Sequence, residues 1–403
     1  MTPTQRTSGP DILFGAFDRH NFGDLLLPHV LTCLLPGRRL RYAGLARRNL
    51  LPFGGHQVGA LTQLAARPGL CPANIIHVGG EILCCDAWEA AVMLQPPDQA
   101  AAVIARFEDR PQERQAWARG VLGVEARAPY LLQQALFPQA RQVIYNAVGG
   151  VDLDRRDPAM RAEVLGKLRA AAHVSVRDAQ TRRILQANGI AASLVPDPAV
   201  MVAALFGTRI HHRAHQGEPA RSIQAFPHGY LAVQFSADFG DDETLRQIAS
   251  QLDRAARATG YGVVLFRAGA APWHDDLSCY QRLAQCMRTP APHIFRSLDI
   301  WDICAVIAHS RGFAGSSLHG RIVAMAYALP RLNFVHPGQA PGAGKQAAYA
   351  ATWEAPGAPR TVAVQELADG IGLALAFERA QREQTARELA AAYRRGFVAV
   401  DEH

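Results

Sequence analysis

Short apolar segments alternate with longer amphipathic segments along most of this chain. In the first half, the apolar segments that we expect to form strands are residues 11–17, 74–78, 141–147, 173–176 and 191–195. Helical patterns follow several of them, at 25–35, 157–172 and 179–188. Because strands that alternate with helices pair side by side in parallel, this pattern predicts an α/β fold with a parallel sheet.

The alternation lapses after residue 205 and resumes at residue 229. The intervening segment has no apolar periodicity and four histidines, which favours a solvated linker over a metal site; these are His211, His212, His215 and His228. We expect an N-terminal Rossmann-like domain at 11–205, a linker at 206–228, a C-terminal Rossmann-like domain at 229–345 and C-terminal helices at 360–403. Two such domains would face each other across a cleft, with the terminal helices packing back.

Composition excludes several classes of function. Only Lys167 and Lys345 are lysines, so arginine supplies nearly all of the positive charge behind the net charge of +7. The arginines form no block, which argues against a nucleic-acid-binding face. The seven cysteines form no C-x-x-C pair, which favours reduced thiols. No apolar run is long enough to span a membrane and residues 1–10 are polar, so we expect a cytoplasmic protein.

The stretch Arg311–Arg321 carries the most chemistry. It predicts a short strand, a turn of small residues, and a helix that begins near Ser317 and ends before Pro330, with a last strand at 331–335 and a loop at 336–359. Free amides and the helix dipole make such a helix start favourable for anions. A titratable His319 there suits an acidic substrate that needs proton transfer. The alternative is serine capping beside a half-exposed histidine.

Similar turns follow other predicted strands. They hold the pairs Asn21/Asp24, Gly79/Gly80, Arg177/Asp178 and His274/Asp275. In open α/β sheets, ligands bind at the carboxyl ends of the strands, so these turns predict one shared site. Helix capping is an alternative role for Asn21 and Asp24, and an ion pair is one for Arg177.

Five short motifs occur in order between residues 11 and 335. They are Asn21–Phe–Gly–Asp24, Gly79–Gly80–Glu81, Ser175–Val–Arg–Asp178, Asp197–Pro–Ala199, and Ser317–Leu–His–Gly–Arg–Ile–Val–Ala324 before Leu329–Pro330. As an ordered set they resemble the polysaccharide pyruvyltransferase family. The resemblance implies two Rossmann-like domains arranged as in glycosyltransferases of type B, with the site between them.

The resemblance also implies an activity. Members of that family transfer pyruvate from phosphoenolpyruvate to sugar hydroxyls as a ketal, and the family's catalytic histidine and donor-binding arginine match His319 and Arg177. No metal or cofactor is expected, and phosphoenolpyruvate would be the donor. The acceptor would be a glycan or a lipid-linked saccharide, and a lipid-linked one would bring the protein to the inner membrane. The predicted substrate-binding residues are Asn21, Asp24, Gly79, Gly80, Glu81, Asn146, Asp178, His274, Ser316, Ser317, Leu318 and Arg321.

Two other functions are compatible with such a fold. A nucleotide-sugar glycosyltransferase would need an acidic ribose ligand near the 311–321 stretch, and no acidic residue lies between Asp302 and Glu354. A non-catalytic protein of polysaccharide assembly would not need both His319 and Arg177.

Overall fold

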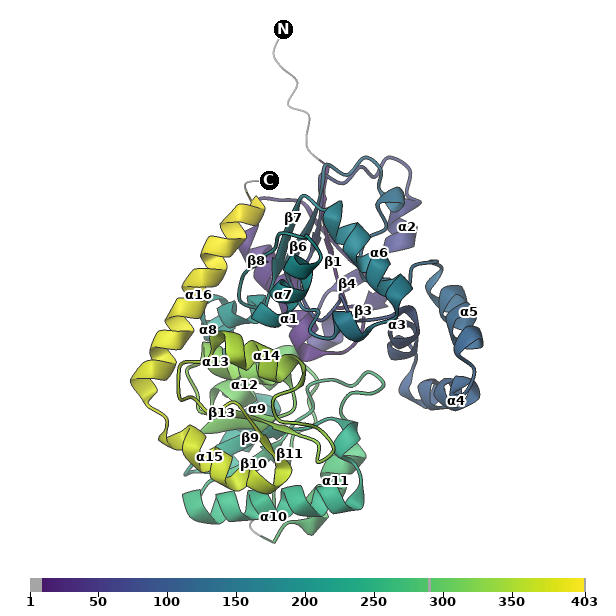
Figure 1. Cartoon of the computed structure of the whole chain (residues 1–403). Helices are drawn as coiled ribbons and strands as arrows, with labels where there is room; N and C mark the ends of the chain where they lie inside the picture. Colours follow the sequence, from purple (N-terminus) through teal and green to yellow (C-terminus); the bar gives the residue numbers. More distant parts are fainter. Residues whose placement is uncertain (1–8, 289–290, 402–403) are drawn as a thin grey trace.

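Two parallel sheets, one in each half of the chain, form two lobes. The computed structural model describes residues 9–288 and 291–401, so the tail at 1–8 lies outside the described residues. Figure 1 shows one lobe built from the first half of the chain and the other from the second half. We call them the N-lobe (residues 11–201) and the C-lobe (residues 230–376).

The N-lobe sheet has eight strands in the order β3-β4-β2-β1-β5-β6-β7-β8. Its strands are β1 (Asp11–Phe14), β2 (Leu40–Gly44), β3 (Arg48–Asn49), β4 (Gln57–Ala60), β5 (Asn74–His77), β6 (Gln142–Val148), β7 (His173–Val176) and β8 (Ser193–Leu194). All neighbours pair in parallel except β3 and β4. The five strands expected from the sequence are present. Strands β2 to β4 were not predicted because their exposed arginines and glycines break any apolar run.

Helices cover this sheet and connect its strands. They are α1 (Phe22–Leu34), α2 (Leu61–Ala65), α3 (Ala87–Met93), α4 (Pro97–Phe107), α5 (Pro111–Leu122), α6 (Pro158–Arg169) and α7 (Ala179–Ala187). Single 3₁₀ turns occur at η1 (Leu51–Phe53), η2 (Gln134–Leu136), η3 (Leu153–Arg155), η4 (Pro198–Met201), η5 (Ala237–Phe239) and η6 (Val364–Glu366).

The C-lobe sheet has six parallel strands in the order β11-β10-β9-β12-β13-β14. Its strands are β9 (Tyr230–Gln234), β10 (Gly262–Leu265), β11 (His293–Ile294), β12 (Gly312–Gly315), β13 (Arg331–Val335) and β14 (Thr361–Ala363). Its helices are α10 (Asp242–Thr259), α11 (Leu277–Cys286), α12 (Ile300–Ala308), α13 (Leu318–Ala326), α14 (Gly344–Trp353) and α15 (Leu367–Ala376).

Three sequence-based expectations about secondary structure are wrong. Residues 336–359 are not one loop, because they contain α14, and 331–335 is not the last strand, because β14 pairs with β13. Residues 206–228 are not irregular: they hold most of α8 (Val202–Ala214) and all of α9 (Gly217–Ala225). Both segments are rich in Ala, Gly and polar residues, so they are ordered by packing rather than by an apolar period of their own.

A continuous hydrophobic core joins the lobes. One cluster of buried side chains includes Leu26 of α1, Met201 of η4, Trp301 of α12 and Ile322 of α13. The final helix, α16 (Arg379–Asp401), leaves the C-lobe and runs back along the N-lobe, as Figure 1 shows. The terminal helices therefore pack back as predicted. Within the described residues, no helix is both long enough and apolar enough to span a membrane.

Candidate functional site

A cavity of 690 Å³ lies between the lobes and is lined by residues of both. Its wall includes residues that directly follow β1, β5 and β7 in the N-lobe and β10 and β12 in the C-lobe. This is the place where parallel α/β sheets bind ligands, because loops and helix starts converge at the carboxyl ends of the strands.

His319 lies in the first turn of α13, at the start of the C-lobe helix that faces the cavity. Ser317 caps this helix, since its hydroxyl accepts a hydrogen bond from the Gly320 amide at 3.1 Å. The imidazole packs against the backbone of α1, where a Cβ at Gly23 would lie 2.0 Å from the ring. Its Nε2 lies 3.5 Å from the Asp197 carboxylate of the N-lobe. The ring is therefore held between the two lobes.

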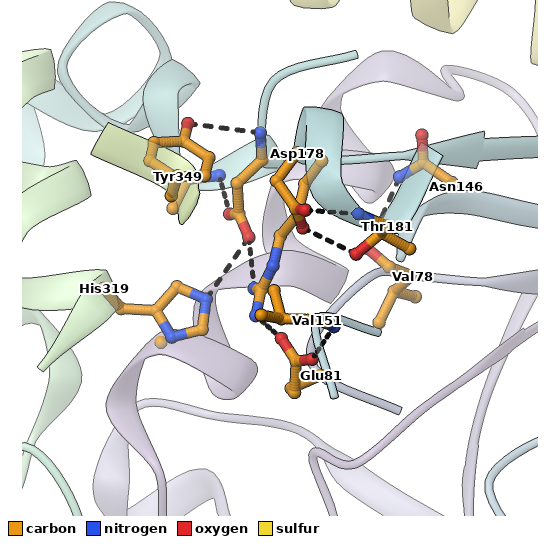
Figure 2. A network of polar contacts seen from close by, with 12 residues as sticks. Val78, Glu81, Asn146, Val151, Asp178, Thr181, His319 and Tyr349 are labelled. Atoms are coloured by element: carbon orange, nitrogen blue, oxygen red, sulfur yellow. Dashed lines mark hydrogen bonds and ion pairs between the residues drawn. The ribbon is translucent and has the colours of Figure 1, made fainter. Parts of the chain in front are cut away.

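Arg177 directly follows β7 and contacts the same carboxylate. Its Nη1 donates to Asp197 Oδ2 at 2.8 Å, and its Nη2 donates to Glu81 Oε2 at 2.6 Å. Figure 2 shows His319 and Glu81 reaching this network from different parts of the chain. One buried carboxylate thus links the imidazole and the guanidinium that the sequence singled out.

The neighbours of Asp197 and Glu81 favour the ionised forms of these two carboxyl groups. Burial acts to raise the pKa of Asp197, but His319 and the Arg177 guanidinium beside it outweigh burial and lower the pKa to about 2. Burial likewise acts to raise the pKa of Glu81, and Arg177 and Lys345 bring the pKa below its usual range. The two carboxylates hold one arginine, so the cluster keeps a net negative charge unless His319 is protonated.

The sequence of residues 129–336, more than half of the chain, matches a family model described as polysaccharide pyruvyl transferase. The chain belongs to this family. The matched region includes Arg177, Asp197 and His319. A comparison with curated proteins found no match.

Solved structures with a similar fold include two sugar-nucleotide epimerases. The UDP-GlcNAc 2-epimerase from Neisseria meningitidis, bound to UDP-GlcNAc, has 10% identity and a TM-score of 0.56, covering 98% of this chain and 99% of that one. The UDP-GlcNAc 2-epimerase from Methanocaldococcus jannaschii, in complex with UDP-GlcNAc and UDP, has 10% identity and a TM-score of 0.53, covering 94% and 99%. At this identity the likeness shows the fold alone. It confirms two Rossmann-like domains arranged as in glycosyltransferases of type B.

Most residues predicted for the site of this pyruvyl transferase family member line the cavity. They are Asn21, Asp24, Glu81, Arg177, His274, Ser316, Ser317, Leu318 and His319. Asn21 also caps α1, as the alternative reading held, and its Nδ2 lies 3.2 Å from His274 Nε2. Burial lowers the pKa of His274 to about 4, so this imidazole is neutral near pH 7.

The prediction that Arg321 binds an anionic group of the substrate is wrong. Its side chain is fully buried, and it donates to Glu354 Oε1 from Nε at 2.9 Å and from Nη2 at 2.6 Å. Its Nη1 donates to Asn333 Oδ1 at 3.1 Å. Two residues along a helix correspond to a rotation of roughly 200°, so Arg321 must face away from the side that His319 presents to the cavity.

Four other predicted residues do not line the cavity. Asn146 is buried and donates to the Tyr393 hydroxyl of α16 at 3.0 Å, so it holds the terminal helix. Asp178 caps α7 by accepting from the Thr181 amide at 2.7 Å, and it does not pair with Arg177. Gly79 and Gly80 have φ values of 119° and 87°, which L residues with side chains rarely adopt. They shape the turn that carries Glu81 and are not among the residues that line the cavity.

Sequence reasoning missed several groups in the cavity wall. The basic residues Arg19, Arg155, Arg156 and Lys345 line it, and so does Gln234. Gln234 ends β9 and links Asp275 to the start of α13, because its Nε2 donates to Asp275 Oδ1 at 2.8 Å and its Oε1 accepts from the Ser317 amide at 2.8 Å. The position of Arg19 in the polar turn after β1 was an available signal. The other basic residues lie in helices and loops without a distinctive pattern.

Proposed function

We propose that this chain transfers pyruvate from phosphoenolpyruvate to two hydroxyls of a sugar in a polysaccharide or its lipid-linked precursor, forming a ketal. The observation that carries the proposal is the buried Asp197 carboxylate, which contacts both His319 and Arg177, two residues that line the cavity between the lobes. Membership of the polysaccharide pyruvyl transferase family supports it. Phosphoenolpyruvate is a cytoplasmic metabolite, so the proposal places the reaction in the cytoplasm.

The proposed reaction begins with a proton added to the methylene carbon of phosphoenolpyruvate, which becomes a methyl group. Positive charge then develops at the carbon that bears the phosphate and the carboxylate. One sugar hydroxyl attacks this carbon and loses its proton, and phosphate leaves with the electrons of its C–O bond. The second hydroxyl then closes the ketal. One hydroxyl proton replaces the proton consumed, and the other leaves with phosphate.

In this proposal His319 supplies the first proton and recovers one from a hydroxyl. A histidine suits both steps because its unperturbed pKa, about 6.5, lies near neutral pH. Asp197 holds the ring in position, as the carboxylate partner of a catalytic histidine commonly does. No resident metal or cofactor is assigned a step.

Arg177 is proposed to bind the anionic donor. Its planar fork suits a carboxylate or a phosphate, yet both of its terminal nitrogens are already paired with carboxylates. The Asp197 side chain is fully buried, whereas the Glu81 side chain is 20% exposed. We therefore expect the donor to displace Glu81 rather than Asp197. Lys345 and Arg19 would supply further positive charge for the donor.

The rival function, a nucleotide-sugar glycosyltransferase, receives no support from Glu354, the first acidic residue that follows the 311–321 stretch. The Glu354 side chain is fully buried and is paired with Arg321 and Arg331. It is therefore not free to bind a ribose.

The test measures phosphate released from phosphoenolpyruvate with a panel of free and lipid-linked glycosides. We expect acceptor-dependent release by the wild type, none by His319→Ala, and unchanged release by His228→Ala, which removes an exposed histidine. Arg177→Lys should raise the KM for phosphoenolpyruvate more than it lowers kcat, since a lysine cannot form the two-pronged contact. Unchanged turnover by His319→Ala would overturn the mechanism.

A further inference from the structure

Trp273 has an unusual backbone conformation for a large residue. Its φ is 62°, in the left-handed region, and the other non-glycine residues with positive φ among those described are alanines, Ala147 and Ala328. A bulky side chain makes this conformation unfavourable, so it persists only where the surroundings impose it. Such strain is a reason to ask what the side chain does.

Both lobes hold the loop that carries Trp273. From the N-lobe, the His20 carbonyl accepts from the amides of Ala270 at 3.2 Å and of Ala271 at 3.3 Å. From the C-lobe, the Ala237 amide donates to the His274 carbonyl at 2.8 Å. Within the loop, the Asp275 amide donates to the Gly269 carbonyl at 3.1 Å. The contacts on either side of Trp273 therefore fix its backbone.

The side chain that this loop presents is an exposed indole on the cavity wall. Trp273 is 43% exposed, whereas Trp301 in the core is 1% exposed. Among the described residues, the other exposed large hydrophobic side chains are Leu51, Val121 and Leu373, and none of these lines the cavity. An exposed aromatic ring in a cavity between polar groups is a common feature of a ligand-binding wall.

The loop that carries the indole contacts the start of α1, the helix against which His319 packs. The neighbouring His274 contacts Asn21 at 3.2 Å, and Asn21 caps α1 at Gly23, against which the His319 ring packs. The same cavity thus holds Arg177, to which the proposed function assigns the donor, and, on another part of its wall, an exposed indole. A volume of 690 Å³ leaves room for a saccharide beside a three-carbon donor.

We propose that Trp273 is the stacking platform for a pyranose ring of the acceptor, which positions the sugar hydroxyls toward His319. This inference rests on the proposed function. A pyranose whose C–H bonds cluster on one face presents an apolar surface that the flat indole covers, while its hydroxyls remain free to react. The strain at residue 273 is then maintained because it directs the indole into the cavity.

The experiment compares Trp273→Ala, Trp273→Phe and Trp273→Gly with the wild type. Binding of methyl galacto-, gluco- and mannopyranosides, with phosphoenolpyruvate present, is followed by saturation-transfer NMR. We expect the wild type to saturate the protons of one ring face. Trp273→Ala should raise the Kd for the glycoside and the acceptor KM about tenfold or more, with the KM for phosphoenolpyruvate unchanged. Trp273→Phe should retain most of the glycoside binding. Leu373→Ala, a matched exposed control, should retain all of it.

Trp273→Gly separates binding from structure. Glycine adopts positive φ without strain, so this variant should unfold at the wild-type temperature or above while losing glycoside binding. A lowered Tm with unchanged glycoside binding would show a structural tryptophan and overturn the inference, as would the absence of glycoside binding by the wild type. Phosphate release with a normal acceptor KM in Trp273→Ala overturns this inference alone. Glycoside binding through Trp273 without phosphate release overturns the proposed function alone.

Discussion

Two carboxyl groups of the candidate site have pKa values that move in opposite directions: Asp197, buried behind His319 and Arg177, and Asp275, on the cavity wall. Burial acts to raise both. At Asp197 the contacts with His319 and with the Arg177 guanidinium outweigh burial and bring the pKa to about 2. At Asp275 burial prevails over hydrogen bonds from neutral donors, including the Ala268 amide, and raises the pKa to about 7. The neighbouring groups, rather than burial, therefore decide which carboxylate is fully ionised at neutral pH.

This contrast predicts a pH-dependent stability that Asp275→Asn should remove. The folded pKa lies above the unfolded value of 3.8, so the folded state keeps a proton that the unfolded chain loses between pH 4 and 7. Wild-type stability from this group is therefore present at low pH and falls as pH rises to 7, by at most about 1.4 kcal/mol per unit. Urea unfolding should be measured at pH 5, 6 and 7. The free energy of unfolding of Asp275→Asn, relative to that of the wild type, should increase at each step.

The control for this experiment is the adjacent Asp276→Asn. Asp276 is exposed and caps α11, a role that asparagine fills equally well. The difference in free energy of unfolding between Asp276→Asn and the wild type should stay constant from pH 5 to pH 7. A constant difference for Asp275→Asn as well would mean that Asp275 ionises normally in the folded protein.

At the scale of elements, the segment from β12 to α13 illustrates what local sequence can predict. An apolar run, a serine cap and the proline at 330 are signals within a few residues of one another, and α13 begins at Leu318, next to the predicted start. The direction of a single side chain on that helix was not predictable in the same way. Arg321 was assigned to the substrate because its partners, Asn333 and Glu354, are distant in sequence and were not connected to it by any pattern.

The same limit applies to the candidate site as a whole. His319 and Arg177 were found from motifs, but the carboxylate that joins them became evident only from the fold. Helix α14 was missed because its alanine-rich sequence lacks an apolar period. Trp273 could not be identified from the sequence, because neither its exposure nor its positive φ follows from the residues around it.

The buried cluster of Arg321, Arg331 and Glu354 fixes α13 against β13, and this predicts a structural phenotype for Arg321→Met. Removing one member of a buried ionic network leaves its partners without compensation and costs about 3–5 kcal/mol. We expect a large loss of stability in denaturant unfolding. The KM for phosphoenolpyruvate should stay normal under conditions where the variant is folded, because Arg321 does not line the cavity.

A surface ion pair provides the comparison. Arg254 pairs with Asp369 at 2.7 Å, and the two side chains are 47% and 76% exposed. Arg254→Met should therefore cost less than about 1 kcal/mol. If Arg321→Met instead raised the KM for the donor at unchanged stability, the guanidinium would have to act on the substrate after all.

At the scale of the whole molecule, one hydrophobic cluster contains side chains from both lobes. The cluster that contains Leu26 and Ile322 also contains Leu389, Tyr393 and Phe397 of α16. Each lobe thus buries apolar surface on the other and on the terminal helix, in addition to a buried cluster of its own. Because the lobes are joined in this way, the two walls of the cavity between them keep a fixed relative position. A site that takes residues from both lobes requires this.

This shared core predicts that the two lobes unfold together. Scanning calorimetry should give one transition for the wild type. Tyr393→Ala should lower its Tm without splitting it, since the cost of truncating a buried aromatic residue, about 3–5 kcal/mol, falls on both lobes. Leu373→Ala, at a site that is 64% exposed, should leave the Tm nearly unchanged. Two separate transitions in the wild type or in Tyr393→Ala would mean that the lobes are independent folding units. The interface between the lobes would then be weaker than its buried side chains imply.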